Sequence, residues 1–243
     1  MAIAINVVLA FMIIACFLIA VVIHECAHAL TASLLGDTTP RAQGRQSLSL
    51  RMQLDPLGTL LCIIMAFQPI AAGPIGLGWG KPVKTDPWKL RGGPNAGTLL
   101  VSFAGIFVSL VLGLLVAFLI RFLPLDVLTA NGIIARVPQF VVVFAATNLI
   151  LGLFNLLPLY PLDGYQILYT LLPSTQALKF AKSAQYGPLI IIVLLFILPF
   201  LGELTNTGGF FLFHLPLYLL QLVLYIVGLI SGHPFIGNIY LNL

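Results

Sequence analysis

The chain has 243 residues, of which 60% are hydrophobic and only 7% are charged. A water-soluble domain carries about 25% charged residues, so the composition excludes a soluble globular protein and predicts an integral membrane protein. The net charge of +4 comes from basic residues dispersed among short loops, which argues against nucleic-acid binding. The same charges are better used to predict how the chain is oriented in a bilayer.

Six apolar stretches follow one another along the chain. The first, residues 3–35, ends at Gly36-Asp37, a pair that is typical of a helix end. The second, residues 56–72, is shorter than the roughly 20 residues that a span needs and leads into a run of glycines, which favours a re-entrant segment. Four clearer spans follow, at residues 98–120, 137–157, 188–201 and 211–230.

A polar connection of residues 38–53 lies between the first two stretches. Within it, residues 47–54 alternate polar and apolar side chains with a period of two, which predicts a short strand or hairpin beside the membrane. The expected fold is therefore all-α: a polytopic transmembrane bundle of about five spans, with a re-entrant or strand-like segment after the first helix. We expect a single domain over residues 1–243, with a core at 3–169 and additional helices at 187–231.

The distribution of Lys and Arg predicts the orientation. If residues 56–72 are re-entrant, nine of the eleven basic residues fall on one side, which the positive-inside rule assigns to the cytosol. The nine are Arg41, Arg45, Arg51, Lys81, Lys84, Lys89, Arg91, Lys179 and Lys182, and the two on the opposite side are Arg121 and Arg136. A full crossing at residues 56–72 would export the lysine cluster, so the bias favours the re-entrant reading.

His24-Glu25-Cys26-Ala27-His28 fits the pattern H-E-x-x-H near the cytosolic end of the first stretch. Histidines four residues apart share one face of a helix and can bind one Zn²⁺ at about 2.0–2.1 Å, while the adjacent Glu acts on a water. Ionisable groups in an apolar run are costly enough at membrane depth to indicate a function. The alternative is a helix end whose polar groups merely reach the interface.

Catalytic zinc usually takes three protein ligands, so a third must come from elsewhere in the chain. Asp163 is the candidate, because the predicted orientation places it on the same side as His24 and His28. It follows a stretch, residues 155–162, in which two prolines interrupt the helix, and broken backbone at membrane depth is tolerated only against protein or a wet cavity. An ordinary turn at the membrane interface is the alternative for this stretch.

Taken together, the two motifs resemble the site-2 protease family of intramembrane zinc metalloproteases, over roughly residues 3–169. The full set is similar to the compact bacterial and archaeal branch, which lacks a PDZ domain. Besides the HExxH motif and Asn155-Leu-Leu-Pro-Leu-Tyr-Pro-Leu-Asp-Gly164, the likeness includes Gly36-Asp37, Gly44-Arg45, Asp55-Pro56-Leu57-Gly58-Thr59, Gly78-Trp79-Gly80-Lys81-Pro82-Val83 and Ala104-Gly105.

The resemblance implies a zinc metalloendopeptidase with one Zn²⁺ per chain, bound by His24, His28 and Asp163. It implies Glu25 as the general base and Asn155 as a polar group at the scissile carbonyl, although Asn155 can equally serve only to tie the broken backbone. The implied partners are a transmembrane protein substrate and the lipid bilayer, with no nucleic acid. The implied location is a prokaryotic plasma membrane, crossed several times, with the active site toward the cytosol; nothing in the sequence sets the oligomeric state.

The chain departs from the family at three positions. Gln53 stands where a His usually precedes Asp-Pro by two residues, and Ile106 and Ser109 replace a Pro and an Asn after Ala-Gly. These positions bear on substrate docking and helix packing, and they leave a catalytically inactive binding or scaffold protein as one alternative. A transporter is the other alternative, since it also places His, Glu and Asp in a bundle, but it does not require this set of motifs.

Overall fold

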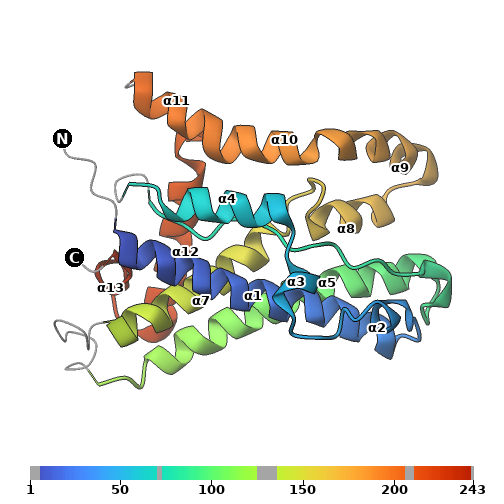
Figure 1. The fold of residues 1–243 in the computed structure, drawn as a ribbon, viewed down its shortest axis with the longest axis horizontal. Helices are drawn as coiled ribbons and strands as arrows, with labels where there is room; N and C mark the ends of the chain where they lie inside the picture. The colour runs from blue at the N-terminus through green and yellow to red at the C-terminus, as the bar shows by residue number, and fades with distance from the viewer. Residues whose placement is uncertain (1–5, 70–72, 125–135, 206–210, 242–243) are drawn as a thin grey trace.

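A computed structural model describes residues 6–69, 73–124, 136–205 and 211–241, although no side chain is described at 203–205 (Figure 1). In chain order its helices are α1 (Val7–Leu34), α2 (Thr39–Ala42), α3 (Leu50–Gln53), α4 (Pro56–Ala66), α5 (Pro94–Ile120), α7 (Arg136–Phe154), α8 (Asp163–Leu171), α9 (Ser174–Ala181), α10 (Gly187–Ile192), α11 (Leu198–Thr205), α12 (Leu215–Ser231) and α13 (Ile236–Leu241). A π turn, Val193–Ile197, joins α10 to α11.

The expected all-α membrane bundle is confirmed. Within the described residues, five helical segments are long and apolar enough to cross a membrane: α1, α5, α7, residues 174–202 and residues 211–231. The expected start of the first stretch, residue 3, lies outside the described residues. Helix α1 begins at Val7, where the Asn6 side chain accepts a hydrogen bond of 3.0 Å from the Leu9 N–H and so caps the helix.

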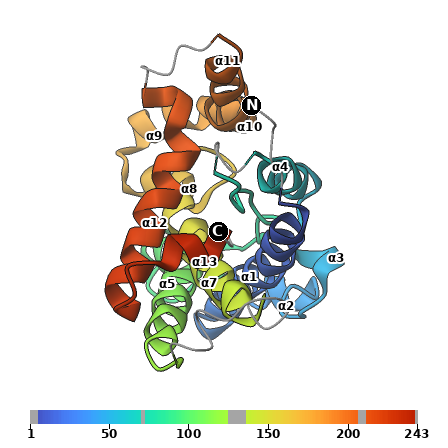
Figure 2. The ribbon, with the colours of Figure 1, turned by 90° about the vertical axis from the view of Figure 1, so that its left-hand side faces the viewer.

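Helices α1, α5 and α7 pack against one another at the centre, and α12 packs on α5 and α7 (Figures 1 and 2). Small residues allow the close approach of α5 and α7. A Cβ added at Gly113 would lie 2.7 Å from the Leu149 side chain, and one at Gly152 would lie 2.7 Å from Leu110. Close packing of small residues is the usual way in which membrane helices associate, because lipid offers them little hydrophobic driving force.

The segment after α1 is re-entrant, as expected. Helix α4 has 11 residues, about 16 Å, which is roughly half of a hydrocarbon core. Residues 70–72 lie outside the described part, and the chain then runs back along α4 as a non-helical return segment, residues 73–86 (Figure 1). Leu54, just before α4, forms an antiparallel bridge with Gly80 on the return segment. The chain therefore enters and leaves this element at the same end.

The strand expected at residues 47–54 is wrong. Residues 50–53 form the short helix α3, and the described residues contain only the isolated Leu54–Gly80 bridge and no strand. The alternation does not separate an inner from an outer face, since the apolar Leu48 and Leu50 are 74% and 44% exposed whereas the polar Gln53 is fully buried.

The far end of the return segment is fixed to the end of α1. The fully buried Asp37 carboxylate accepts hydrogen bonds from the Asp86 N–H at 2.7 Å and the Thr39 N–H at 2.9 Å. Burial by itself raises the pKa of this carboxyl, but these hydrogen bonds outweigh burial and hold the pKa below its ordinary value. The Gly36-Asp37 helix end thus holds the return segment over the C-terminal half of α1.

The re-entrant topology can be tested by single-cysteine labelling in a background without Cys16, Cys26 and Cys62. Arg51 and Lys84 are exposed on either side of α4 in the sequence. We expect a membrane-impermeant maleimide to label Arg51→Cys and Lys84→Cys from the same side of the membrane. Arg121→Cys, beyond the far end of α5, is the control and should be labelled from the other side. Opposite-side labelling of positions 51 and 84 would make α4 a crossing.

Candidate active site

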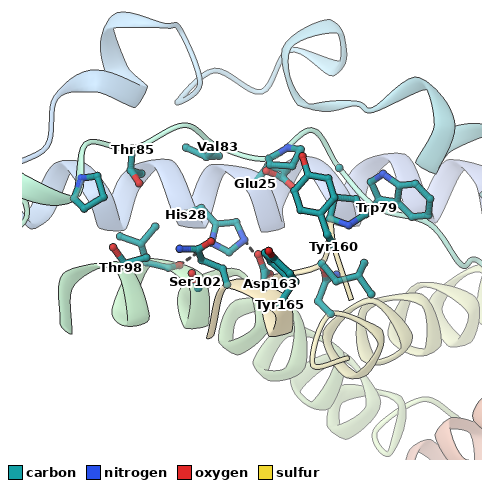
Figure 3. Close-up of a pocket in the computed structure, with 18 residues that line it drawn as sticks. Glu25, His28, Trp79, Val83, Thr85, Thr98, Ser102, Tyr160, Asp163 and Tyr165 are labelled. Carbon is teal, nitrogen blue, oxygen red and sulfur yellow. Dashed lines mark hydrogen bonds and ion pairs between the residues drawn. The ribbon is translucent and has the colours of Figure 1, made fainter. Parts of the chain in front are cut away.

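The two histidines of the HExxH motif and Asp163 meet inside the bundle. His24 and His28 lie one turn apart on the inner face of α1, with ring centroids 4.8 Å apart and exposures of 2% and 4%. Asp163 is the first residue of α8, and its Oδ2 lies 2.9 Å from His24 Nε2. The same oxygen lies 3.2 Å from His28 Nε2 (Figure 3). The three residues expected as ligands are therefore brought together from two distant parts of the chain.

This cluster fits a tetrahedral metal ion. The three candidate ligand atoms lie within 4.8 Å of one another. Bonds of about 2.0–2.1 Å to a tetrahedral centre separate two ligand atoms by about 3.3 Å, close to the separations from Asp163 Oδ2. His28 Nε2 is buried and has no hydrogen-bond partner among the described residues, although a carboxylate oxygen is close to it. A buried nitrogen left in this way is suited to coordination.

Helix α5 orients both imidazole rings. The Val101 carbonyl lies 2.7 Å from His28 Nδ1, and a carbonyl can only accept a hydrogen bond, so Nδ1 carries the proton and Nε2 keeps its lone pair for a metal. Ser109 Oγ lies 2.9 Å from His24 Nδ1 and can accept a hydrogen bond in the same way. The departure from the family at Ser109 thus places a hydroxyl next to a candidate ligand, a role that the sequence did not indicate.

Gly105 allows α5 to approach the two candidate ligand histidines. A Cβ at this position would overlap His28 Nε2 and would lie 2.7 Å from His24 Nε2. The next residue, Ile106, is fully buried, and its carbonyl lies against Gly152 of α7. The second departure from the family therefore takes part in apolar packing, and α5 continues through it as a regular helix.

Glu25 is 5% exposed and lies between a buried arginine and the return segment. Its Oε2 is 3.3 Å from Nη2 of Arg45. The Arg45 guanidinium also donates from Nη1 to the Met52 carbonyl and from Nη2 to the Lys81 carbonyl. A Cβ at Gly80 would overlap Oε1 of Glu25, so only glycine fits beside the carboxylate. From the sequence, Arg45 was counted only among the basic residues that predict the orientation. The Gly44-Arg45 pair, which is part of the likeness to the family, was the signal that could have indicated a role in the site.

Gln53 belongs to the scaffold around this arginine. Its side chain is fully buried, and Nε2 donates to the carbonyls of Arg45 at 2.7 Å and Ser47 at 2.9 Å. At the third departure from the family, the Gln53 amide therefore joins the end of the connection between α1 and α4 to the middle of the same connection.

Asn155 follows the last residue of α7 and lines the same cavity as Glu25 and Asp163. Its side-chain Nδ2 donates to the Leu151 carbonyl at 2.9 Å. Its main-chain carbonyl accepts a hydrogen bond of 2.6 Å from the Gly164 N–H. Asn155 thus ties the broken backbone, as the simpler alternative expects. A primary amide has two N–H groups, so one remains for a ligand in the cavity.

The cavity beside these residues has a volume of about 290 Å³. Helix α5 contributes Thr98 and Ser102 to it, and the return segment contributes Gly80 and Val83 (Figure 3). Asp163 and Tyr165 lie on the side opposite the return segment, and Tyr160 joins the lining from the break between α7 and α8. The candidate base and a candidate ligand therefore face a shared space.

Comparison with known proteins agrees with this site. Residues 124–198, which include Asn155 and Asp163, match the model of Peptidase family M50. The chain is 34% identical over 192 residues to "Putative zinc metalloprotease YwhC" of Bacillus subtilis, covering 76% of this chain and 81% of that protein. The chain belongs to peptidase family M50. It is also 34% identical over 203 residues to "Putative zinc metalloprotease Rip2" of Mycobacterium tuberculosis, covering 82% of this chain and 70% of that protein.

No solved structure matches the chain. Membership of M50 confirms the resemblance drawn from the motifs, and with it the expectation of a metalloprotease. The assignment of individual residues to roles rests on the geometry described above.

Gly105→Ala tests the close approach of α5 to the ligands. The added methyl group must displace both imidazole rings, so we expect the affinity for Zn²⁺ to fall about 10-fold or more. Competition with a chromogenic chelator on the purified protein measures this affinity. The matched control is Gly237→Ala in α13, where a Cβ would have no neighbour within 4 Å. Equal affinities in the two variants would contradict the steric argument.

Proposed function

We propose that this protein is an intramembrane zinc metalloprotease that hydrolyses peptide bonds within or near transmembrane segments of membrane-protein substrates. The observation that carries the proposal is the convergence of His24, His28 and Asp163 beside Glu25, in a cavity within a bundle of membrane-long helices. A transporter needs no such convergence. An inactive scaffold is disfavoured because the proposed base and all three proposed ligand side chains are retained in the chain and lie close together.

Each side chain has a separate task in the proposed reaction. His24, His28 and Asp163 hold one zinc ion, which when bound supplies Lewis acidity and lowers the pKa of a water toward 7. Glu25 takes a proton from the attacking water and passes it to the leaving amine. The free N–H of the Asn155 amide donates to the oxyanion that develops on the scissile carbonyl.

The return segment offers a place for an unwound substrate. A peptide bond in a lipid-embedded helix is dry and hydrogen-bonded, so it must be unwound before hydrolysis. Near Gly80 one edge of the return segment is already occupied, because Leu54 bridges to Gly80 and the Lys81 N–H donates to the Gln53 carbonyl at 2.7 Å. The side that lines the cavity remains, and an extended peptide added along it would pass the ligand cluster.

We infer from the charge bias that the site faces the cytosol of a prokaryotic plasma membrane. The connection that follows α1 carries Arg41, Arg45 and Arg51, and His28 lies in the half of α1 that leads into this connection. The positive-inside rule places such loops in the cytosol.

Removal of single ligands tests the metal site. We expect purified wild-type protein to hold one zinc per chain, and His28→Ala or Asp163→Ala to lose it, because two ligands do not retain zinc against a chelator. Elemental analysis after chelator treatment measures the metal. His214→Ala, remote from the cluster in the sequence, is the control and should retain zinc. Stoichiometric zinc in both ligand variants would refute the assignment.

Replacing the base separates chemistry from structure. Gln keeps the size of Glu25 but cannot accept a proton at neutral pH, so Glu25→Gln should retain zinc and lose about 10²–10⁴-fold in rate. Asn155→Ala should be milder, with a loss of at most about 10²–10³-fold. Cleavage of a model transmembrane substrate in liposomes, with zinc content measured in parallel, gives both quantities. Wild-type turnover by Glu25→Gln would exclude this mechanism.

A further inference from the structure

We propose that Arg45 is a positioning residue for the reaction: its guanidinium fixes the carboxylate of Glu25 in the orientation that proton transfer requires. The inference rests on the proposed function, since it assigns Arg45 to the same site, and it gives a role to a residue that neither of the two motifs contains.

The ion pair of Arg45 and Glu25 is almost completely buried, and this burial needs an explanation. The side chain of Arg45 is 4% exposed and that of Glu25 is 6% exposed, with Nη2 and Oε2 3.3 Å apart. A guanidinium remains charged in proteins, and its burial is costly unless its N–H groups are paired. Replacing a buried ion pair by apolar residues is often neutral or stabilising, so stability alone is a weak explanation for this one.

The guanidinium is itself held in place from two further directions. It donates to the carbonyl of Met52 in α3 and to the carbonyl of Lys81 on the return segment. The fork of N–H groups is planar and rigid, so two carbonyl partners determine where the N–H groups that face Glu25 point. The two backbone segments therefore fix the guanidinium of Arg45, and the guanidinium in turn fixes the carboxylate of Glu25.

The main chain of Arg45 is anchored as well. Its N–H donates to the Pro40 carbonyl at 3.0 Å, and its carbonyl accepts the 2.7 Å hydrogen bond from Gln53 Nε2. Both ends of this long side chain are therefore fixed. An arginine that served only as a solvated charge in a loop would need neither anchor.

Glu25 is clamped on both oxygens. Arg45 contacts Oε2, and the backbone at Gly80 lies so close to Oε1 that a Cβ there would overlap it. A glutamate side chain has three torsions, and restricting them costs conformational entropy. These contacts already restrict the torsions of Glu25 before a substrate binds. A general base must lie within hydrogen-bond reach of the proton, and a displacement of about 1 Å can lower the rate about 100-fold.

The test compares Arg45→Met with Arg45→Lys, using the same liposome assay. Arg45→Met keeps the apolar length of the side chain but releases Glu25, so we expect kcat to fall about 10–100-fold while KM and zinc content stay near wild type. Arg45→Lys keeps the charge and should recover part of the loss, because one ammonium group cannot reproduce the fork. Arg51→Met, an exposed arginine of the same connection, is the matched control and should leave kcat unchanged.

A double variant shows whether Arg45 acts through Glu25. In the Glu25→Gln background there is no base to orient, so adding Arg45→Met should change the residual rate less than about 2-fold. An undiminished kcat in Arg45→Met, an additive loss in the double variant, or loss of zinc from both Arg45 variants would overturn the proposal. Failure of the proposed function is a separate result, since the wild-type protein itself would then cleave no transmembrane substrate.

Discussion

The structure depends on the need to pair every ionisable group that is placed inside an apolar helix. His24, Glu25 and His28 lie in a membrane-long segment, where an unpaired polar group costs several kcal/mol. Each therefore has partners supplied by another element. Groups of α5 hydrogen-bond to the Nδ1 atoms of the two histidines, Asp163 lies next to their Nε2 atoms, and Arg45 forms an ion pair with Glu25. The packing of α5, α8 and the α1–α4 connection around α1 follows from this requirement.

Two glycines make that pairing sterically possible. Gly105 lets α5 come close enough for its backbone to reach an imidazole, and Gly80 lets the return segment pass directly over Glu25. Backbone at such short range excludes lipid and bulk water without contributing a side chain of its own. The same approach leaves a cavity between α5, the return segment and Tyr160, so that the proposed catalytic groups are enclosed on one side and accessible on the other.

The sequence predicted the parts that follow from local pattern or length. The spacing of His24 and His28 determines a shared helical face, charge bias placed Asp163 at the same end, and the length of α4 indicated a re-entrant element. It did not predict Arg45 or Ser109, because their contacts join positions 20 and 85 residues apart, nor Val101, which contributes only a backbone carbonyl. The alternation that predicted a strand failed because residues 50–53 form a helical turn in which the polar Gln53 is buried and the apolar Leu50 is exposed.

The most direct test of the account is X-ray absorption spectroscopy at the zinc edge of the purified protein. The account predicts one zinc per chain with two imidazole nitrogens and two oxygens at about 2.0–2.2 Å, one oxygen coming from Asp163 and one from water. His28→Ala, which keeps only two of the three proposed ligands, should show no bound zinc. A sulfur neighbour at about 2.3 Å, which Cys26 within the motif would supply, or an absence of bound zinc, would contradict the proposed site.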